Sequence, residues 1–154
     1  MIIFTDENIP RHLAPGFQLI QGPESLKTGI PLEVKHLPDH FGYGSKDKDW
    51  IPEIGKLKAC VITTDIHLNR RKHEISLLRE HKLGIFFLRA KTKKSGLCVW
   101  QMVEMLARSW TEITKIAVEE KRPFGYEVYV TGKLKKVFER DIKAFLVSLI
   151  QKTI

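Results

Sequence analysis

Two short apolar runs in this chain each end in an aspartate, and this pattern constrains the fold more than any other feature of the sequence. Residues 1–4 lead through Thr5 to Asp6, and residues 59–62 lead through two threonines to Asp65. Short apolar runs with β-branched residues are typical of strands buried on both faces, as in a parallel sheet. In an open α/β sheet the carboxyl ends of the strands meet at one edge, where ligands bind. We therefore expect Asp6 and Asp65 to lie at the same edge of a mainly parallel sheet.

The composition is that of an ordinary folded domain. The chain has 154 residues, of which 43% are hydrophobic and 29% charged, enough for one core and unlike a disordered chain. No run approaches the length of about 18 apolar residues typical of a membrane span, and no signal-peptide pattern is present. Cys60 and Cys98 lie in apolar surroundings, so we expect buried free thiols. These features predict a single domain over residues 1–154 in a cytoplasmic protein with no membrane contact.

The remaining patterns predict an alternation of strands and helices. Further strands are expected at residues 32–37 and 83–88. Helices are expected at residues 10–14, 46–55, 66–81 and 95–120. Such alternation is typical of a parallel sheet with helices on both faces. The tail differs, because residues 126–138 predict a β-hairpin and residues 140–154 an amphipathic helix.

Several acidic residues fall where a divalent metal would need them. Asp47 and Asp49 open the helix that precedes the second aspartate-bearing strand, and Glu7 follows Asp6 where the chain turns. Clustered carboxylates repel one another unless a proton or cation intervenes, and hard divalent ions prefer oxygen ligands. We expect Asp6, Asp47 and Asp65 to bind a metal, with Asp49 and Glu7 as further ligand candidates. The alternative for each aspartate taken singly is a helix cap.

The charge balance indicates a polyanionic partner. Lysine and arginine number 26 against 18 acidic residues, a net charge of +8 that favours association with nucleic acid. A basic, solvated surface is the alternative. A basic chain with an acidic cluster suits a nuclease, because cations bind the phosphates while carboxylates hold a metal. The residues expected to bind RNA phosphates are Arg11, Asn69, Arg70, Arg71 and Lys72.

Three segments resemble the PIN-like domains, which include ribonuclease toxins of the VapC type and a compact DEN-type group. These segments are Ile-Phe-Thr-Asp-Glu-Asn-Ile-Pro-Arg at residues 3–11, Asp-Lys-Asp-Trp-Ile at 47–51 and Val-Ile-Thr-Thr-Asp at 61–65. The strand at residues 83–88 and the helix that contains Trp110 extend the resemblance to roughly residues 1–120.

The resemblance implies a three-layer α/β fold with a central, mainly parallel sheet and ribonuclease activity dependent on Mg²⁺ or Mn²⁺. Asp6 and Asp65 match the strand-end aspartates of the family, and Asp47 matches its helix-borne acid, with Asp49 as the alternative. RNA is then the substrate, and an antitoxin protein and a second copy of the chain are the protein partners to expect.

The sequence departs from the better-known PIN pattern after the strand at residues 83–88. Residues 88–91, Leu-Arg-Ala-Lys, offer no carboxylate there, so a single-metal site or a weaker second site is an open alternative. Two functions follow: a metal-dependent endoribonuclease, as the toxin of a toxin–antitoxin pair, or a non-catalytic RNA-binding or protein-interaction module of the same fold. A haloacid dehalogenase-type phosphatase needs a second aspartate where Asn8 stands, which argues against that class.

Overall fold

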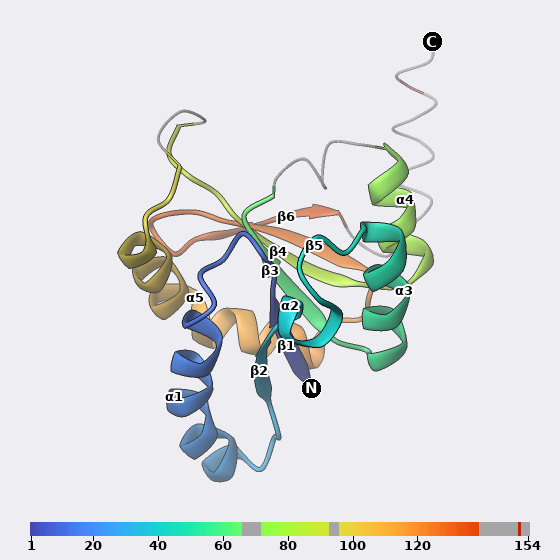
Figure 1. Cartoon of the computed structure of the whole chain (residues 1–154). Helices are drawn as coiled ribbons and strands as arrows, with labels where there is room; N and C mark the ends of the chain where they lie inside the picture. Colours follow the sequence, from blue (N-terminus) through green and yellow to red (C-terminus); the bar gives the residue numbers. More distant parts are fainter. Residues whose placement is uncertain (66–71, 93–95, 139–150, 152–154) are drawn as a thin grey trace.

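The structure is a computed structural model that describes residues 1–65, 72–92, 96–138 and 151 (Figure 1). Within these residues one sheet contains six strands, in the order β2-β1-β3-β4-β5-β6. The strands are β1 Ile2–Thr5, β2 Glu33–His36, β3 Cys60–Thr63, β4 Gly84–Leu88, β5 Phe124–Val128 and β6 Leu134–Phe138. The helices are α1 Leu13–Thr28, α2 Leu37–Phe41, α3 Asp47–Leu57, α4 Lys72–Glu80 and α5 Val99–Glu119.

The sheet is mainly parallel, as the sequence predicts. Strands β1 to β5 pair in parallel, and β6 pairs antiparallel to β5. The predicted hairpin is therefore confirmed, but its first strand begins at Phe124 rather than at residue 126 and pairs with β4. It is the fifth parallel strand of the main sheet and not a separate ribbon. The helix expected at residues 140–154 lies outside the described residues except for Gln151.

Helices cover both faces of the sheet and form two separate cores with it. Alternate strand residues point to opposite faces, so Ile62 and Phe86 face one core while Val61 and Ile85 face the other. Helices α1 and α5 pack on the first face, and α3 and α4 on the second (Figure 1). Because both faces are covered, the central strands are apolar throughout, which is why their sequences show no alternation.

The first helix differs most from its prediction. The glycines and prolines after residue 14 suggested a break, but α1 continues for 16 residues, with Pro23 inside it. It packs on α5, where the Phe17 and Trp110 rings lie 4.7 Å apart between centroids. The Trp110 indole also donates to Gln21 Oε1 at 2.9 Å. Leu19 and Leu26 point to solvent, so apolar residues on both faces conceal the helical period.

The other predicted elements lie within a few residues of those observed, with two corrections. Of the helix expected at residues 66–81, the structure describes α4, while residues 66–71 lie outside the described part. Cys98, expected to be buried, is exposed because α5 begins only at Val99, whereas Cys60 is buried as predicted. Among the described helices, none is both long enough and apolar enough to cross a membrane.

Candidate active site

The two strand-end aspartates meet where the strand order reverses. From β1 the chain passes through α1 to β2 on one side, and later through α3 to β3 on the other side. Ligands of open α/β sheets bind in the crevice at such a reversal, beyond the carboxyl ends of the strands. The Asp6 backbone N–H donates to Ile62 O at 3.0 Å, which holds Asp6 against the end of β3. The structure thus brings Asp6 and Asp65 to the edge that the sequence indicates.

Thr63 connects the two aspartates. Its hydroxyl donates to one carboxylate oxygen of Asp6 and accepts the backbone N–H of Asp65 at 2.9 Å. The other Asp6 oxygen accepts the backbone N–H of Asn8 at 3.1 Å. These contacts fix the Asp6 side chain in one orientation. Sequence reasoning missed Thr63, although a threonine two residues before Asp65 on a buried strand was a usable signal.

The electrostatic environment of Asp6 shows that the acidic groups are close neighbours. Only 8% of Asp6 is exposed, and burial is the largest cause that raises its pKa to about 6. The negative charges of Asp65 and Glu7 raise this pKa further, while the hydrogen bonds from Thr63 and Asn8 lower it. A cation at this point would relieve the repulsion and favour the charged form of Asp6.

A small cavity of about 50 Å³ opens between these side chains. The described residues that line it include four acids and no lysine or arginine. The described lining is Asp6, Glu7, Asn8, Leu37, Gly42, Ser45, Asp47, Trp50 and Asp65. We call Asp6, Glu7, Asp47 and Asp65 the acidic cluster.

Neighbouring groups orient Asp47 and Glu7, the other two acids of the cluster. The indole of Trp50 donates to Asp47 Oδ1 at 3.1 Å, so the buried ring positions the helix-borne carboxylate. Glu7 Oε2 accepts the backbone N–H of Gly44 at 2.9 Å and ties the loop before α3 to the end of β1. Asp49, the alternative ligand, is exposed and does not line the cavity.

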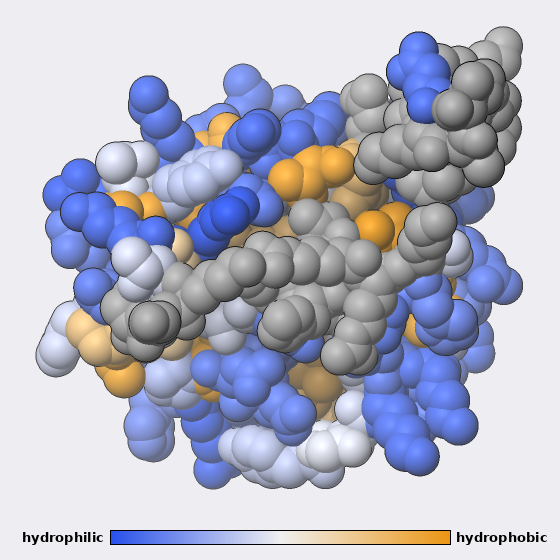
Figure 2. All heavy atoms as spheres, turned by 90° about the horizontal axis from the view of Figure 1, so that it is seen from above, coloured by the Kyte–Doolittle hydropathy of each residue, from blue (hydrophilic) through white to orange (hydrophobic). Residues whose placement is uncertain are grey.

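The predicted phosphate-binding residues are only partly described. Arg11 lies in a neighbouring cleft, where its Nε is 3.2 Å from Asp39 Oδ1. Lys72 is the first residue of α4, and Asn69, Arg70 and Arg71 lie outside the described residues. Seen from above the carboxyl ends of the parallel strands, the coloured part of the surface is mostly hydrophilic (Figure 2).

The edge beyond β4 contains a carboxylate that sequence reasoning overlooked. Glu127 on β5 lies beside the end of β4, but its Oε2 is 2.7 Å from Arg89 Nη1 and accepts the Tyr129 hydroxyl at 2.8 Å. The ion pair raises the already high pKa of Arg89. The better-known PIN pattern has an acid after the strand that corresponds to β4. Glu127, which lies beside the end of β4, is already neutralised by Arg89.

The donor set of the acidic cluster fits a hard divalent ion, although its members are not arranged as ready ligands. In the described parts of the chain, no three His, Cys, Asp or Glu side chains converge closely enough to hold a metal. Among the described residues, the lining of the cavity nevertheless offers only carboxylate charges, and its volume exceeds the roughly 10–15 Å³ that one water-sized group occupies. Mg²⁺ uses few carboxylates and retains several waters, so a wide cluster suits it.

A comparison with models of known protein families identifies the family of this chain. The family model described as PIN like domain matches residues 1–90, more than half of the chain. The chain belongs to the PIN-like domain family. PIN-like domains are generally nucleases and typically use divalent metals, and the matched segment contains the whole acidic cluster. No curated protein and no solved structure gave a match.

Proposed function

We propose that this PIN-like domain is a metal-dependent endoribonuclease that hydrolyses RNA phosphodiesters. The observation that carries the proposal is the acidic cluster around one cavity at the strand-order reversal, with Asp6 close enough to Asp65 and Glu7 for their charges to raise its pKa. The net charge of +8 supports a polyanionic substrate. The continuous sheet supports the expectation of one domain over the whole chain.

Within this proposal, Asp6, Asp47 and Asp65 hold Mg²⁺ or Mn²⁺. When bound, such an ion stabilises negative charge on phosphoryl oxygens and makes water a stronger nucleophile at neutral pH. The chain itself supplies orientation, since Thr63 fixes Asp6 and Trp50 fixes Asp47. Burial of Asp6 keeps bulk water away and strengthens its electrostatic interactions.

We infer that one ion, rather than two, serves this site. Arg89 already neutralises Glu127, so the carboxylate beside the end of β4 carries no free charge for a second cation. A single-ion site agrees with the absence of an acid from residues 88–91.

The test is the substitution Asp65→Asn, which preserves shape and removes the charge that a hard cation requires. We expect Mn²⁺-dependent cleavage of a labelled single-stranded RNA to fall by at least about 100-fold, since displaced metal ligands remove most of the charge stabilisation. Circular dichroism should show an intact fold, and calorimetric Mn²⁺ binding should be lost.

Asp49→Asn is the matched control, because Asp49 is an exposed aspartate outside the cavity. It should cleave RNA and bind Mn²⁺ like the natural protein. If Asp65→Asn does not fold, Asp47→Asn gives the same test from α3. Full activity in a folded Asp65 variant would refute the assignment.

The alternative function is a non-catalytic RNA-binding or protein-interaction module, which the absence of a tight ligand group among the described residues favours. RNA binding by the natural protein without cleavage in Mg²⁺ or Mn²⁺ would establish it. The endoribonuclease proposal includes a role as the cytoplasmic toxin of a toxin–antitoxin pair, with an antitoxin protein and a second copy of the chain as partners. Growth arrest on expression that Asp65→Asn abolishes would support that role.

A further inference from the structure

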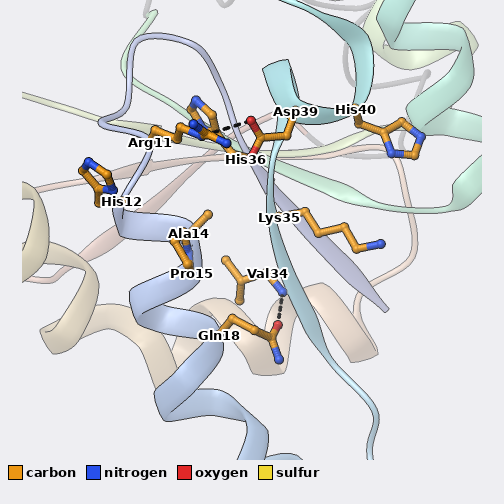
Figure 3. Close-up of a pocket in the computed structure, with 10 residues that line it drawn as sticks. All are labelled: Arg11, His12, Ala14, Pro15, Gln18, Val34, Lys35, His36, Asp39 and His40. Atoms are coloured by element: carbon orange, nitrogen blue, oxygen red, sulfur yellow. Dashed lines mark hydrogen bonds and ion pairs between the residues drawn. The ribbon is translucent and has the colours of Figure 1, made fainter.

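A second, larger hollow lies beside the acidic cluster, and its chemistry is the opposite. This cleft of about 580 Å³ runs between the first turn of α1 and the edge strand β2 (Figure 3). It adjoins the cluster through neighbouring residues, because the Thr5 hydroxyl contacts His36 Nδ1 at 2.9 Å. Thr5 precedes Asp6, and His36 precedes Leu37, which lines the acidic cavity. We call this hollow the basic cleft.

The described lining of the basic cleft includes two cations, and each is in an ion pair: Arg11 with Asp39, and Lys35 with Glu33, whose Oε2 lies 3.3 Å from Lys35 Nζ. Arg11, His12 and Lys35 line it, and Asp39 is the one acid among the described residues there. Figure 3 shows Arg11 beside Asp39 at one end of the cleft, with His12 near the start of α1. Lys35 points away from α1 in Figure 3, so an anion in the cleft would meet donors from the start of α1.

Arg11 is poised to exchange its partner for a phosphate. Its ion pair with Asp39 joins side chains that are 64% and 47% exposed, and exposed pairs of this kind contribute little stability. The contact uses Nε, whereas the two Nη groups are the donors that bind phosphate oxygens bidentately.

The histidines of the cleft do not suggest a metal site instead. Burial lowers the pKa of His36, which favours the neutral ring, while the nearby charge of Asp39 opposes this shift. The described side chains include no group of three or more metal-ligating residues. Burial thus disfavours a charge on His36, and the positive charge beside the start of α1 comes from Arg11.

We propose that the basic cleft binds a phosphate and nucleoside of the single-stranded RNA next to the bond that the acidic cluster cleaves. This inference rests on the proposed function, which supplies RNA as the substrate. The cleft volume lies within the range of about 300–1,000 Å³ typical of small-molecule sites, so one nucleotide fits. Arg11 binds the phosphate, and the bound nucleotide sets the position of the strand across the acidic cavity.

The experiment measures binding of a labelled ten-nucleotide single-stranded RNA by fluorescence anisotropy in EDTA, over a series of salt concentrations. Arg11→Gln should weaken binding about 10-fold and reduce the salt dependence by about 0.7, the value for one lost phosphate contact on a single strand. Lys56→Gln is the control, because Lys56 also forms an exposed ion pair, at 3.0 Å from Glu53, and lies outside both hollows.

The outcomes are distinct. Equal, small effects of Arg11→Gln and Lys56→Gln would overturn the basic cleft as an RNA subsite while leaving cleavage by the natural protein unaffected. A second outcome is that the natural protein binds RNA in a way that depends on Arg11 but fails to cleave it. That result would refute the proposed function and leave the RNA subsite standing. A third outcome is that AMP or inorganic phosphate displaces the labelled RNA as effectively as unlabelled RNA does. That result would assign the cleft to a small phosphate ligand and overturn the RNA assignment.

Discussion

At the scale of single residues, Asp6 combines burial with nearby negative charge, and both raise its pKa to about 6. The hydrogen bonds from Thr63 and Asn8 oppose this rise without cancelling it. A carboxyl group must be ionised to bind a cation. Metal-dependent activity should therefore increase as the pH rises through about 6.

The same residue makes the stability of the metal-free protein depend on pH. The unfolded chain loses the Asp6 proton near the ordinary value of 3.8, whereas the folded protein retains it up to about 6. Between these values the unfolded state binds fewer protons, so the free energy of unfolding decreases as the pH rises and stays lower above 6. Asp6→Asn removes this loss and should be about 2–3 kcal/mol more stable than the natural protein at pH 7.5, but not at pH 3.5.

Urea unfolding in EDTA at the two pH values measures this difference. Added Mg²⁺ should raise the melting temperature of the natural protein at pH 7.5 and leave that of Asp6→Asn unchanged, because ligand binding stabilises only the state that binds. The same pH dependence in both proteins would show that Asp6 is not the group responsible.

The pattern of strands could predict the positions of the strand-end acids, whereas the preference for Asp47 over Asp49 rests on the resemblance to PIN-like domains. Parallel strands bring their carboxyl ends to one edge whatever their side chains are, so Asp6 and Asp65 follow from the pattern of apolar runs. Asp47 and Asp49 lie in one helical turn, and the structure distinguishes them because Trp50 contacts Asp47 and because Asp47, unlike Asp49, lines the cavity. Such a contact depends on tertiary packing.

At the scale of elements, α1 shows why a helix rich in glycine and proline escapes prediction. Intrinsic propensity disfavours Gly16, Gly22 and Pro23, yet packing of Leu13 and Phe17 in the core outweighs this cost. The central strands β3 and β4 were easier to predict, because burial on both faces demands apolar residues along them.

Gly84 in β4 is a position where close packing admits no side chain. A Cβ atom there would lie 2.4 Å from Phe124 Cζ and 2.9 Å from Cys60 Sγ. Gly84→Ala should therefore lower the free energy of unfolding by about 1–3 kcal/mol, because the aromatic ring must shift within a filled core. Chemical denaturation at pH 7.5 measures the change.

Gly22→Ala in α1 is the matched control for this substitution. Its Cβ would meet nothing within 4 Å, and its backbone is helical. Alanine should stabilise the protein by about 0.5–1 kcal/mol, since it loses less backbone entropy in a helix. An unchanged stability of Gly84→Ala beside the expected gain at Gly22 would show that β4 and β5 are less tightly packed than the structure indicates.

At the scale of the whole molecule, the last described strand completes a core instead of projecting toward a partner. Phe138 of β6 is 7% exposed and belongs to the core that α3 and α4 cover. Its ring also fills the space beside Gly125, where a Cβ would lie 2.3 Å from Phe138 Cε1. Packing within the protein's own fold therefore accounts for β6.

A chain that ends at Lys133 should consequently lose much of its stability. Removal of β6 exposes the edge of β5 and a face of the core, and loss of a buried phenylalanine alone costs about 3–5 kcal/mol. We expect the melting temperature to fall by about 6–20 °C, since each kcal/mol of lost stability lowers it by roughly 2–4 °C for a chain near this size. Light scattering should show an unchanged assembly state.

Phe138→Ala is the companion variant, because it removes only the core side chain, and its effect should be smaller than that of the truncation. A truncated chain with unchanged melting but a lower assembly state would instead identify β6 as an interface.

The two outer strands of the sheet also determine how neighbouring copies meet. Strand β2 is only four residues long, carries the exposed Glu33 and Lys35, and its Val34 N–H is taken by Gln18 Oε1 at 2.6 Å. Strand β6 places Lys135 and Lys136 next to each other on the other side. Short, charged or covered edges disfavour the addition of strands from another molecule. Neighbouring copies of the chain can therefore come close together without joining their sheets into fibrils.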